Sequence, residues 1–267
     1  MGTSTRVRVP KMHGAQNDFV LLDARTAALG DLSAFARWAC DRRAGVGADG
    51  LLVLETSRNG DVRMRTINAD GSEAEICGNG VRCAARWLDE AGAGERMAFE
   101  TPAGTIHTEI IARAPEYQVR VAMGTPRIAS FVVPGFSEAS FVDLGNPHVV
   151  VFCEEPSAVD LEALAERLQR DPRLPDGANV HVVAVESSGC LRVRHWERGV
   201  GLTMACGTGA VACAAVAIAQ RKVISPVSLD VPGGRLTVEC DGRGDAFLSG
   251  AATRVFDAEV EFGPHRD

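Results

Sequence analysis

The sequence Cys-Gly-Asn-Gly at residues 77–80 and the sequence Cys-Gly-Thr-Gly at residues 206–209 are the most informative stretches of this chain. Each precedes an apolar, alanine-rich segment with helix-forming composition. A glycine-rich turn that leads into a helix directs backbone N–H groups and the positive end of the helix dipole toward one point, which favours a carboxylate or a thiolate. A thiol at such a point has a lowered pKa. We therefore expect Cys77 and Cys206 to be a pair of proton carriers.

The two cysteines lie 129 positions apart, and other landmarks keep nearly the same spacing. They are the pairs Asn17 and Asn146, Arg65 and Arg194, and the turns that begin at Pro102 and Pro232. A spacing that holds across most of the chain indicates an ancient duplication, so we predict two homologous halves. We interpret the two arginines as structural charges.

Alternating apolar strands dominate each half, and two helices are expected in each. The expected helices are Leu32–Arg43, Val81–Glu90, Leu161–Arg170 and Ala210–Arg221. The last is apolar on nearly all sides, so the strands of its own half must enclose it. We predict an α+β fold of two pseudo-symmetric domains, each a mostly antiparallel sheet wrapped around a central apolar helix, with the active site in the cleft between them. The expected domains are residues 1–126, joined by a C-terminal strand at 256–267, and residues 127–255, with a linker at 124–135.

Composition is ordinary for a soluble globular chain, and it favours a small-molecule ligand. Of the 267 residues, 46% are hydrophobic and 24% are charged, and the net charge of −7 comes without a long basic run. We therefore expect no nucleic-acid partner. No apolar run reaches the roughly 18 residues that a membrane helix needs. The first six residues contain no apolar signal core, so a cytoplasmic location is expected.

The eight cysteines do not show the ligand spacing of zinc sites. We expect no metal, and we expect the six cysteines other than Cys77 and Cys206 to be buried small hydrophobes. These are Cys40, Cys83, Cys153, Cys190, Cys213 and Cys240. Residues 45–50 make a poor dinucleotide fingerprint, and no Walker pattern is present, so we expect no cofactor.

Two thiols on opposite sides of one bound molecule suggest racemisation or epimerisation. One thiolate removes the α-proton of an amino acid, and the other thiol delivers a proton to the opposite face. The intermediate carbanion needs preorganised donors, which paired helix N-termini would supply. Such a reaction needs no pyridoxal cofactor.

The chain resembles the diaminopimelate epimerases from about residue 12 to about residue 232. The likeness rests on residues 14–19 (GAQNDF), 68–73 (NADGSE), 145–148 (GNPH) and 197–201 (ERGVG), together with the two cysteine turns. It implies interconversion of LL- and meso-diaminopimelate in lysine and peptidoglycan precursor synthesis, with Cys77 and Cys206 as acid and base. A homodimer is also a family-level expectation.

The resemblance also implies roles for the residues around the cysteines. Gly78, Asn79, Gly207 and Thr208 would hold the reacting carboxylate. Asn17, Asn68, Asn146, Asn179, Glu197 and Arg198 would bind substrate, chiefly at the distal amino acid centre. His148 and Glu197 would tune the thiols. A distal carboxylate suits the planar guanidinium of an arginine, and a distal ammonium suits carboxylate and amide oxygens.

Three positions depart from the family pattern: Gly50 replaces a common glutamine, His181 a common asparagine, and Leu202 a frequent glutamate. Two alternatives stay open at this point. One is an isomerase of the same architecture that resembles proline racemase, whose substrate has no second charged centre. The other is a non-catalytic amino-acid-binding or thiol-redox protein, although no Cys-x-x-Cys pair is present.

Overall fold

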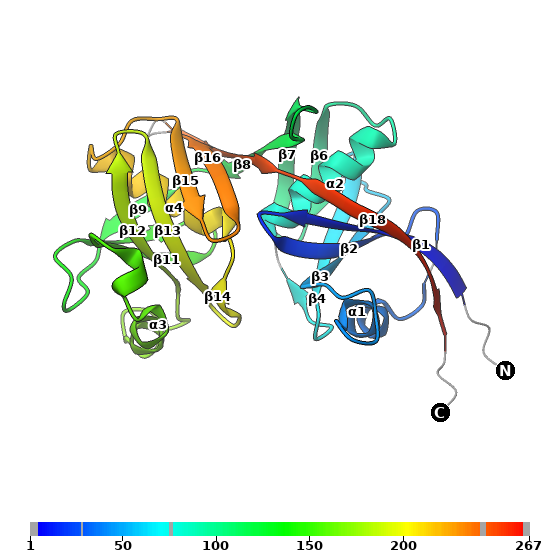
Figure 1. Cartoon of the computed structure of the whole chain (residues 1–267), viewed down its shortest axis with the longest axis horizontal. Helices are drawn as coiled ribbons and strands as arrows, with labels where there is room; N and C mark the ends of the chain where they lie inside the picture. Colours follow the sequence, from blue (N-terminus) through cyan, green and yellow to red (C-terminus); the bar gives the residue numbers. More distant parts are fainter. Residues whose placement is uncertain (1–4, 28, 75–76, 241–243, 264–267) are drawn as a thin grey trace. The chain divides into compact units, whose positions relative to one another are not determined.

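The structure is a computed structural model of the chain, and it describes residues 5–27, 29–74, 77–240 and 244–263. These residues form two compact units (Figure 1). Unit 1 comprises the described parts of Met1–Val119 and Ala252–Asp267, and unit 2 comprises the described parts of Arg120–Ala251. The division therefore falls inside strand β8 (Gln118–Gly124), ahead of the linker expected at residues 124–135. That the halves are homologous stays a prediction.

Unit 1 contains two α-helices and a mixed sheet. Its strands are β1 (Thr5–Gly14), β2 (Asn17–Asp23), β3 (Gly50–Glu55), β4 (Val62–Asn68), β5 (Glu73–Ala74), β6 (Arg96–Thr101), β7 (Gly104–Ala112) and β18 (Thr253–Phe262). They pair in the order β18-β1-β2-β3-β4-β6-β7, with β5 added on β4. The β2–β3 and β4–β6 pairs are parallel, and the other pairs are antiparallel. Residues 264–267 of the expected C-terminal strand lie outside the described residues.

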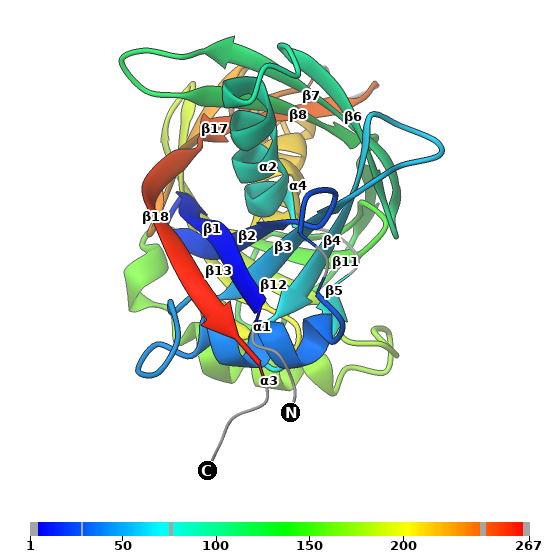
Figure 2. The same cartoon turned by 90° about the vertical axis from the view of Figure 1, so that its right-hand side faces the viewer.

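The two helices of unit 1 cover opposite faces of this sheet. Helix α1 (Leu32–Cys40) begins at Asp31, whose carboxylate accepts a hydrogen bond from the amide of Ala34 at 2.9 Å. It packs on alternate residues of β2 and β3, including Val20 and Leu51. Helix α2 (Gly78–Glu90) lies on the other side of β1, β2 and β3 (Figure 2). Because successive side chains of a strand point to opposite faces, the same strands present an apolar face to each helix.

Unit 2 repeats this plan. Its strands are β8 from Arg120 onward, β9 (Arg127–Ser130), β10 (Ala139–Asp143), β11 (Pro147–Phe152), β12 (Asn179–Ser187), β13 (Cys190–Glu197), β14 (Gly201–Thr203), β15 (Val227–Val231), β16 (Gly234–Glu239) and β17 (Ala246–Ala251). Its helices are α3 (Leu161–Gln169) and α4 (Gly207–Ala219), and a short 3-10 helix spans Pro156–Ala158. The order is β9-β10-β11-β12-β13-β15-β16-β17, with β14 added on β13.

The two units have the same sequence of pairings. In unit 2, β11–β12 and β13–β15 are parallel, and they match β2–β3 and β4–β6 of unit 1. Helix α4 follows the short strand β14, as α2 follows β5. Ten of its 13 residues are buried, so the expected enclosed apolar helix is confirmed in unit 2.

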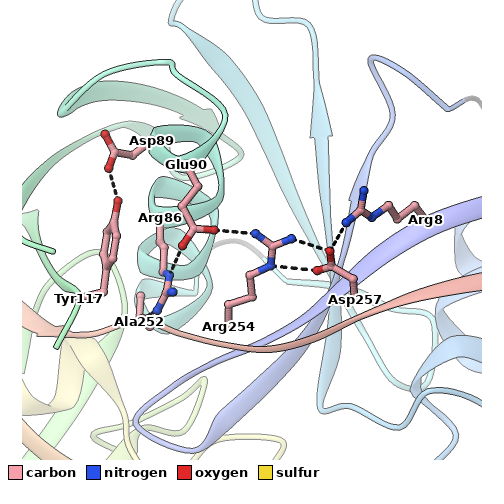
Figure 3. A network of polar contacts seen from close by, with 8 residues as sticks. All are labelled: Arg8, Arg86, Asp89, Glu90, Tyr117, Ala252, Arg254 and Asp257. Atoms are coloured by element: carbon pink, nitrogen blue, oxygen red, sulfur yellow. Dashed lines mark hydrogen bonds and ion pairs between the residues drawn. The ribbon is translucent and has the colours of Figure 1, made fainter. Parts of the chain in front are cut away.

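An ion pair joins the C-terminal half of α2 to β18, and a hydrogen bond joins α2 to the residue just before that strand (Figure 3). Arg254 of β18 bonds Glu90 of α2 at 2.8 Å and Asp257 of its own strand at 2.9 Å. Arg86 of α2 donates to the backbone oxygen of Ala252 at 2.7 Å, just before β18 begins. These contacts fix the last strand on the helix whose first turn carries Cys77.

Two details correct the sequence-based expectations. The expected linker contains strand β9, all four of whose residues are exposed and which pairs with β10. Cys153 and Cys190 are only partly buried, whereas the other four cysteines interpreted as hydrophobes are buried. Cys190 lies near the sheet surface, where its thiol approaches the carboxylate of Asp230 at 3.6 Å.

Among the residues that the structure describes, no helix is long and apolar enough to cross a bilayer.

Candidate active site

Cys77 is the N-cap residue of α2, with an extended backbone (φ −135°, ψ 103°). Its carbonyl oxygen accepts the first helical hydrogen bond, from the amide of Val81 at 2.9 Å. The first-turn amides of a helix have no partner within the helix, so they are available to an anion there. A side chain at Gly80 would crowd β3, because an added Cβ would lie 2.6 Å from Cδ2 of Leu52.

Two asparagines predicted to bind substrate lie beside this thiol. The side-chain oxygen of Asn17 accepts from Nδ2 of Asn79 at 3.2 Å and lies 3.6 Å from Sγ of Cys77. Asn17 donates in turn to Oδ2 of Asp49 at 2.8 Å. The acidic partner fixes the orientation of the amide, because a carboxylate can only accept. Asp49 therefore directs the oxygen of Asn17 toward Cys77.

A buried cation lies behind the same turn. Arg82 is fully buried, and its Nη2 donates to Oδ1 of Asn79 at 2.9 Å. Complete burial lowers the pKa of Arg82, while the thiols of Cys83 and Cys77 act in the opposite direction. The attraction is mutual, so the guanidinium favours an anion at Cys77. Arg82 is not among the predicted site residues, although a charged residue close to the apolar positions five places after the cysteine is a detectable signal.

Asn68 lies at the end of β4, and its exposed side chain donates to Oγ of Ser72 at 2.9 Å. Gly50, one of the three unusual positions, faces it across the β3–β4 pair. An added Cβ at Gly50 would come 3.0 Å from the carbonyl oxygen of Ile67. The close strand contact thus favours glycine at this position.

Cys206 is the N-cap of α4 and has the same extended backbone (φ −117°, ψ 114°). Cys206 is only 3% exposed; its thiol accepts from the amide of Gly209 at 3.4 Å and lies 3.6 Å from Oγ1 of Thr208. The helix geometry around the two cysteines is therefore alike.

The charges around Cys206 differ from those around Cys77. Burial raises the pKa of Cys206 well above its ordinary value, and the nearby Glu197 raises it further; Thr208 and the amide of Gly209 act against both. Burial likewise raises the pKa of Glu197. The lowered pKa expected from the helix N-terminus alone is wrong for Cys206, because desolvation and a neighbouring carboxylate outweigh the helix.

Asn146 and His148 lie next to Thr208. Nδ2 of Asn146 approaches Oγ1 of Thr208 at 3.4 Å, and its Oδ1 bonds Nε2 of His148 at 2.8 Å. His148 is completely buried, which lowers its pKa to about 3, and the charge of Arg198 contributes to the lowering. His148 is therefore neutral at physiological pH.

The side chain of Asn179 is hydrogen-bonded to the backbone on both sides, including the backbone of Arg198. Asn179 is buried; its Nδ2 donates to the carbonyl of Pro147 at 3.1 Å, and its Oδ1 accepts from the amide of Arg198 at 3.0 Å. The exposed guanidinium of Arg198 donates to the carbonyl of Asp176 at 2.6 Å. Asn179 thus orients the arginine through its backbone.

The structure accordingly groups Asn17, Asn79 and Cys77 in unit 1, and Asn146, His148, Asn179, Glu197, Arg198, Cys206 and Thr208 in unit 2. Leu202, in β14, is about half exposed. Across the described ranges, no group of three or more histidine, cysteine, aspartate or glutamate side chains is arranged to hold a metal ion.

A sequence model of the family described as "Diaminopimelate epimerase" matches residues 9–129 and 140–255. This chain belongs to the diaminopimelate epimerase family. The diaminopimelate epimerase of Sphingopyxis alaskensis is 40% identical over 266 residues, which cover 96% of this chain and 97% of that protein. The diaminopimelate epimerase of Rhizorhabdus wittichii is 42% identical over 272 residues, with 96% of each chain covered. Like these relatives, this family member is an isomerase.

Solved structures with lower identity have the same fold. A phenazine biosynthesis protein of the PhzF family from Bacillus anthracis has a TM-score of 0.73 at 18% identity, covering 96% of this chain and 99% of that chain. A hydroxyproline epimerase from Agrobacterium vitis, with bound trans-4-OH-L-proline, has a TM-score of 0.67 at 17% identity, covering 96% and 91%. The predicted α+β fold of the diaminopimelate epimerase type is confirmed.

Proposed function

We propose that this chain interconverts LL- and meso-2,6-diaminopimelate by a two-base mechanism without a cofactor, with Cys77 and Cys206 as the acid–base pair. The observation that carries the proposal is the placement of the two cysteines. Each caps the helix that follows the equivalent short strand, in a chain that belongs to the diaminopimelate epimerase family. Lysine and peptidoglycan precursor synthesis is the biosynthetic setting of this reaction.

The charges near each thiol determine which cysteine holds a proton before the reaction begins. The buried guanidinium of Arg82 favours a thiolate at Cys77, and Glu197 with burial keeps Cys206 protonated. In one direction of the reaction, the thiolate of Cys77 removes the α-proton and becomes a thiol. Cys206 then gives its proton to the opposite face of the carbanion and becomes a thiolate. The reverse direction exchanges the two roles.

Backbone amides supply the stabilisation that the carbanion requires. The α-carboxylate takes up charge as the α-proton leaves, and preorganised N–H donors lower the energy of that state. Gly78, Asn79, Gly207 and Thr208 lie in the first turns of α2 and α4 and are the proposed donors. Glycine at positions 80 and 209 lets these turns pack closely on the side chains of Leu52 and His181.

Specificity rests on the distal amino acid centre. The exposed guanidinium of Arg198 suits the distal carboxylate. Asn17, Asn68, Asn146 and Glu197 are the proposed partners of the remaining polar groups, and Asn179 holds Arg198 in place. A proline-like substrate offers no second charged centre to these residues, so that alternative leaves Arg198 without a role. A homodimer and a cytoplasmic location are further predictions from the family.

Chiral chromatography of the product tests the proposal. Purified reduced protein should convert LL-diaminopimelate to the meso isomer, and Cys77→Ser and Cys206→Ser should each lower turnover at least about a thousandfold, since each removes one of two required acid–base groups. L-Proline and trans-4-hydroxy-L-proline serve as competing substrates. Turnover of either cyclic amino acid in place of diaminopimelate would reject the assignment.

A further inference from the structure

Three buried histidines lie on three neighbouring strands beneath the Cys206 turn. His148 is in β11, His181 in β12 and His195 in β13, and none is more than 1% exposed. His181 lies opposite His195 in the antiparallel β12–β13 pair, and opposite Val150 in the parallel β11–β12 pair. Their register therefore brings the three rings together.

The rings are hydrogen-bonded in series. Nδ1 of His148 lies 2.9 Å from Nε2 of His181, and Nδ1 of His181 lies 2.8 Å from Nδ1 of His195. At the other end, Nε2 of His148 bonds Oδ1 of Asn146. Burial lowers the pKa of His148 and of His195 to about 3, and that of His181 well below its ordinary value. Each ring is thus neutral and carries one N–H.

Because each ring carries one N–H, the hydrogen bonds of the series must all run in the same direction. A neutral imidazole has one donor and one acceptor, so every ring must donate toward Asn146 or every ring must donate away from it. Nε2 of His195 ends the series and, within the described part of the chain, is buried without a hydrogen-bond partner. An unpaired buried N–H is rarer than an unpaired acceptor. The terminal nitrogen is therefore the bare acceptor, and all three N–H groups point toward Asn146.

This direction determines how Thr208 donates. With Oδ1 of Asn146 accepting from His148, the Nδ2 group of the same amide faces Oγ1 of Thr208 at 3.4 Å. The hydroxyl then accepts from Asn146, and its own proton is free for Sγ of Cys206 at 3.6 Å. In the opposite direction the amide would turn, and its oxygen would draw the hydroxyl proton away from the sulfur.

We propose that His181 and His195 are positioning residues that fix the tautomer of His148, and through Asn146 and Thr208 direct a hydrogen bond to the thiolate form of Cys206. The inference rests on the proposed function, in which Cys206 alternates between thiol and thiolate. Among the charged groups of the described residues, Glu197 of β13 is the one that acts on Cys206, and Arg198, just after that strand, acts on His148. Glu197 opposes the anion, so Thr208 counteracts a repulsion.

The tautomers are measurable directly in the wild-type protein by long-range ¹H–¹⁵N correlation of the histidine rings. We expect His148 and His181 to be protonated at Nε2 and His195 at Nδ1, all neutral at pH 7. Protonation of His148 at Nδ1, or a charged ring in the series, would overturn the inference. This readout needs no turnover, so it is independent of the proposed reaction.

A pair of variants tests the consequence for catalysis. His195→Leu removes the donor to His181, whereas His195→Asn keeps an N–H near the position of Nδ1. In His195→Leu nothing donates to Nδ1 of His181, so the proton of that ring is no longer confined to Nε2 and the reversed series becomes populated. The acidic limb of the kcat/KM profile should then move up, by up to about one pH unit, in the direction of reaction in which Cys206 removes the proton. It should stay in place in the opposite direction and in His195→Asn.

Equal shifts in both directions, or equal effects of the two variants, would show a merely structural role and refute the inference. Circular dichroism of both variants establishes that they fold. If both unfold, the tautomers of the wild-type protein decide. Wild-type protein that turns over no diaminopimelate would refute the proposed function and leave the tautomer result standing.

Discussion

The imidazole ring of His181 occupies the space that a side chain at Gly209 would need. A Cβ added at Gly209 would lie 2.4 Å from Cε1 of the ring and 2.7 Å from its Nε2. The ring is held by hydrogen bonds at both nitrogens, so it cannot move aside without breaking the histidine series. His181 therefore sets how closely the first turn of α4, with Cys206, approaches the sheet.

Gly209→Ala should consequently impair both stability and turnover. We expect a loss of about 2–3 kcal/mol in the free energy of unfolding, measured by urea denaturation, and at least about a tenfold fall in kcat/KM. His181→Asn shortens the side chain, so the double variant should recover part of the stability. Gly189→Ala, where an added Cβ meets nothing within 4 Å, is the control.

Gly80→Ala provides the matched comparison in unit 1. Its added Cβ would meet Cδ2 of Leu52, the end of a flexible side chain, so the cost should be smaller than at Gly209. An equal or larger loss of stability in Gly80→Ala would show that the fixed ring of His181 is not what restricts position 209.

Glu197→Gln should increase the reactivity of Cys206. Burial is the first cause of the raised pKa of this thiol, and the charge of Glu197 is the second. Removing the charge lowers the pKa of Cys206, so at pH 8 alkylation of the Cys206 peptide, followed by mass spectrometry, should quicken about three- to tenfold. Glu186→Gln, a change at an exposed glutamate of the same unit, should leave the rate unchanged. Slower alkylation in Glu197→Gln would contradict the electrostatic account.

Stability should fall as the pH drops from about 6.5 toward 5. The pKa values of His13, His148, His181 and His195 are all lowered in the folded protein, chiefly by burial. Below about pH 6.5 the unfolded chain binds protons that the folded chain excludes. Each such histidine lowers the free energy of unfolding by up to about 1.4 kcal/mol per pH unit. Denaturation at several pH values gives the slope of the free energy of unfolding against pH. In His195→Leu that slope should correspond to the uptake of about one proton fewer on unfolding. A flat profile in the wild type would contradict this.

Asp49→Ala should weaken catalysis although Asp49 acts on the thiol of Cys77 only through Asn17. Its carboxylate holds Nδ2 of Asn17 at 2.8 Å, which points Oδ1 of Asn17 toward Cys77. A hydrogen bond to a charged group is worth about 1.5–3 kcal/mol, so kcat/KM should fall about tenfold or more. Asp61→Ala, which removes a 2.7 Å bond to the amide of Ala98 in the same unit, is the control. Equal losses in the two variants would argue against an orienting role.

The sequence predicts the features that depend on local chemistry. The cysteine turns, the four helices and the main strands follow from glycine spacing and apolar periodicity, which are visible within short windows. Strand β9 escapes this reasoning because its four exposed residues have no apolar alternation, and only its pairing with β10 makes it a strand.

The electrostatics of the site depend on tertiary structure. His148 and His181 are 33 positions apart and His181 and His195 are 14 apart, so only strand register joins them. Burial likewise reversed the expected direction of the pKa shift at Cys206. Arg82 could have been noticed in the sequence, but its role depends on its complete burial behind Cys77.

Proton NMR of LL-diaminopimelate with reduced protein in D2O tests the two-thiol account most directly. We predict deuterium at the α-carbon of the inverted centre, with meso product formed, and loss of turnover in both Cys77→Ser and Cys206→Ser. Inversion that retains the original α-proton, or full turnover in either serine variant, would contradict the account.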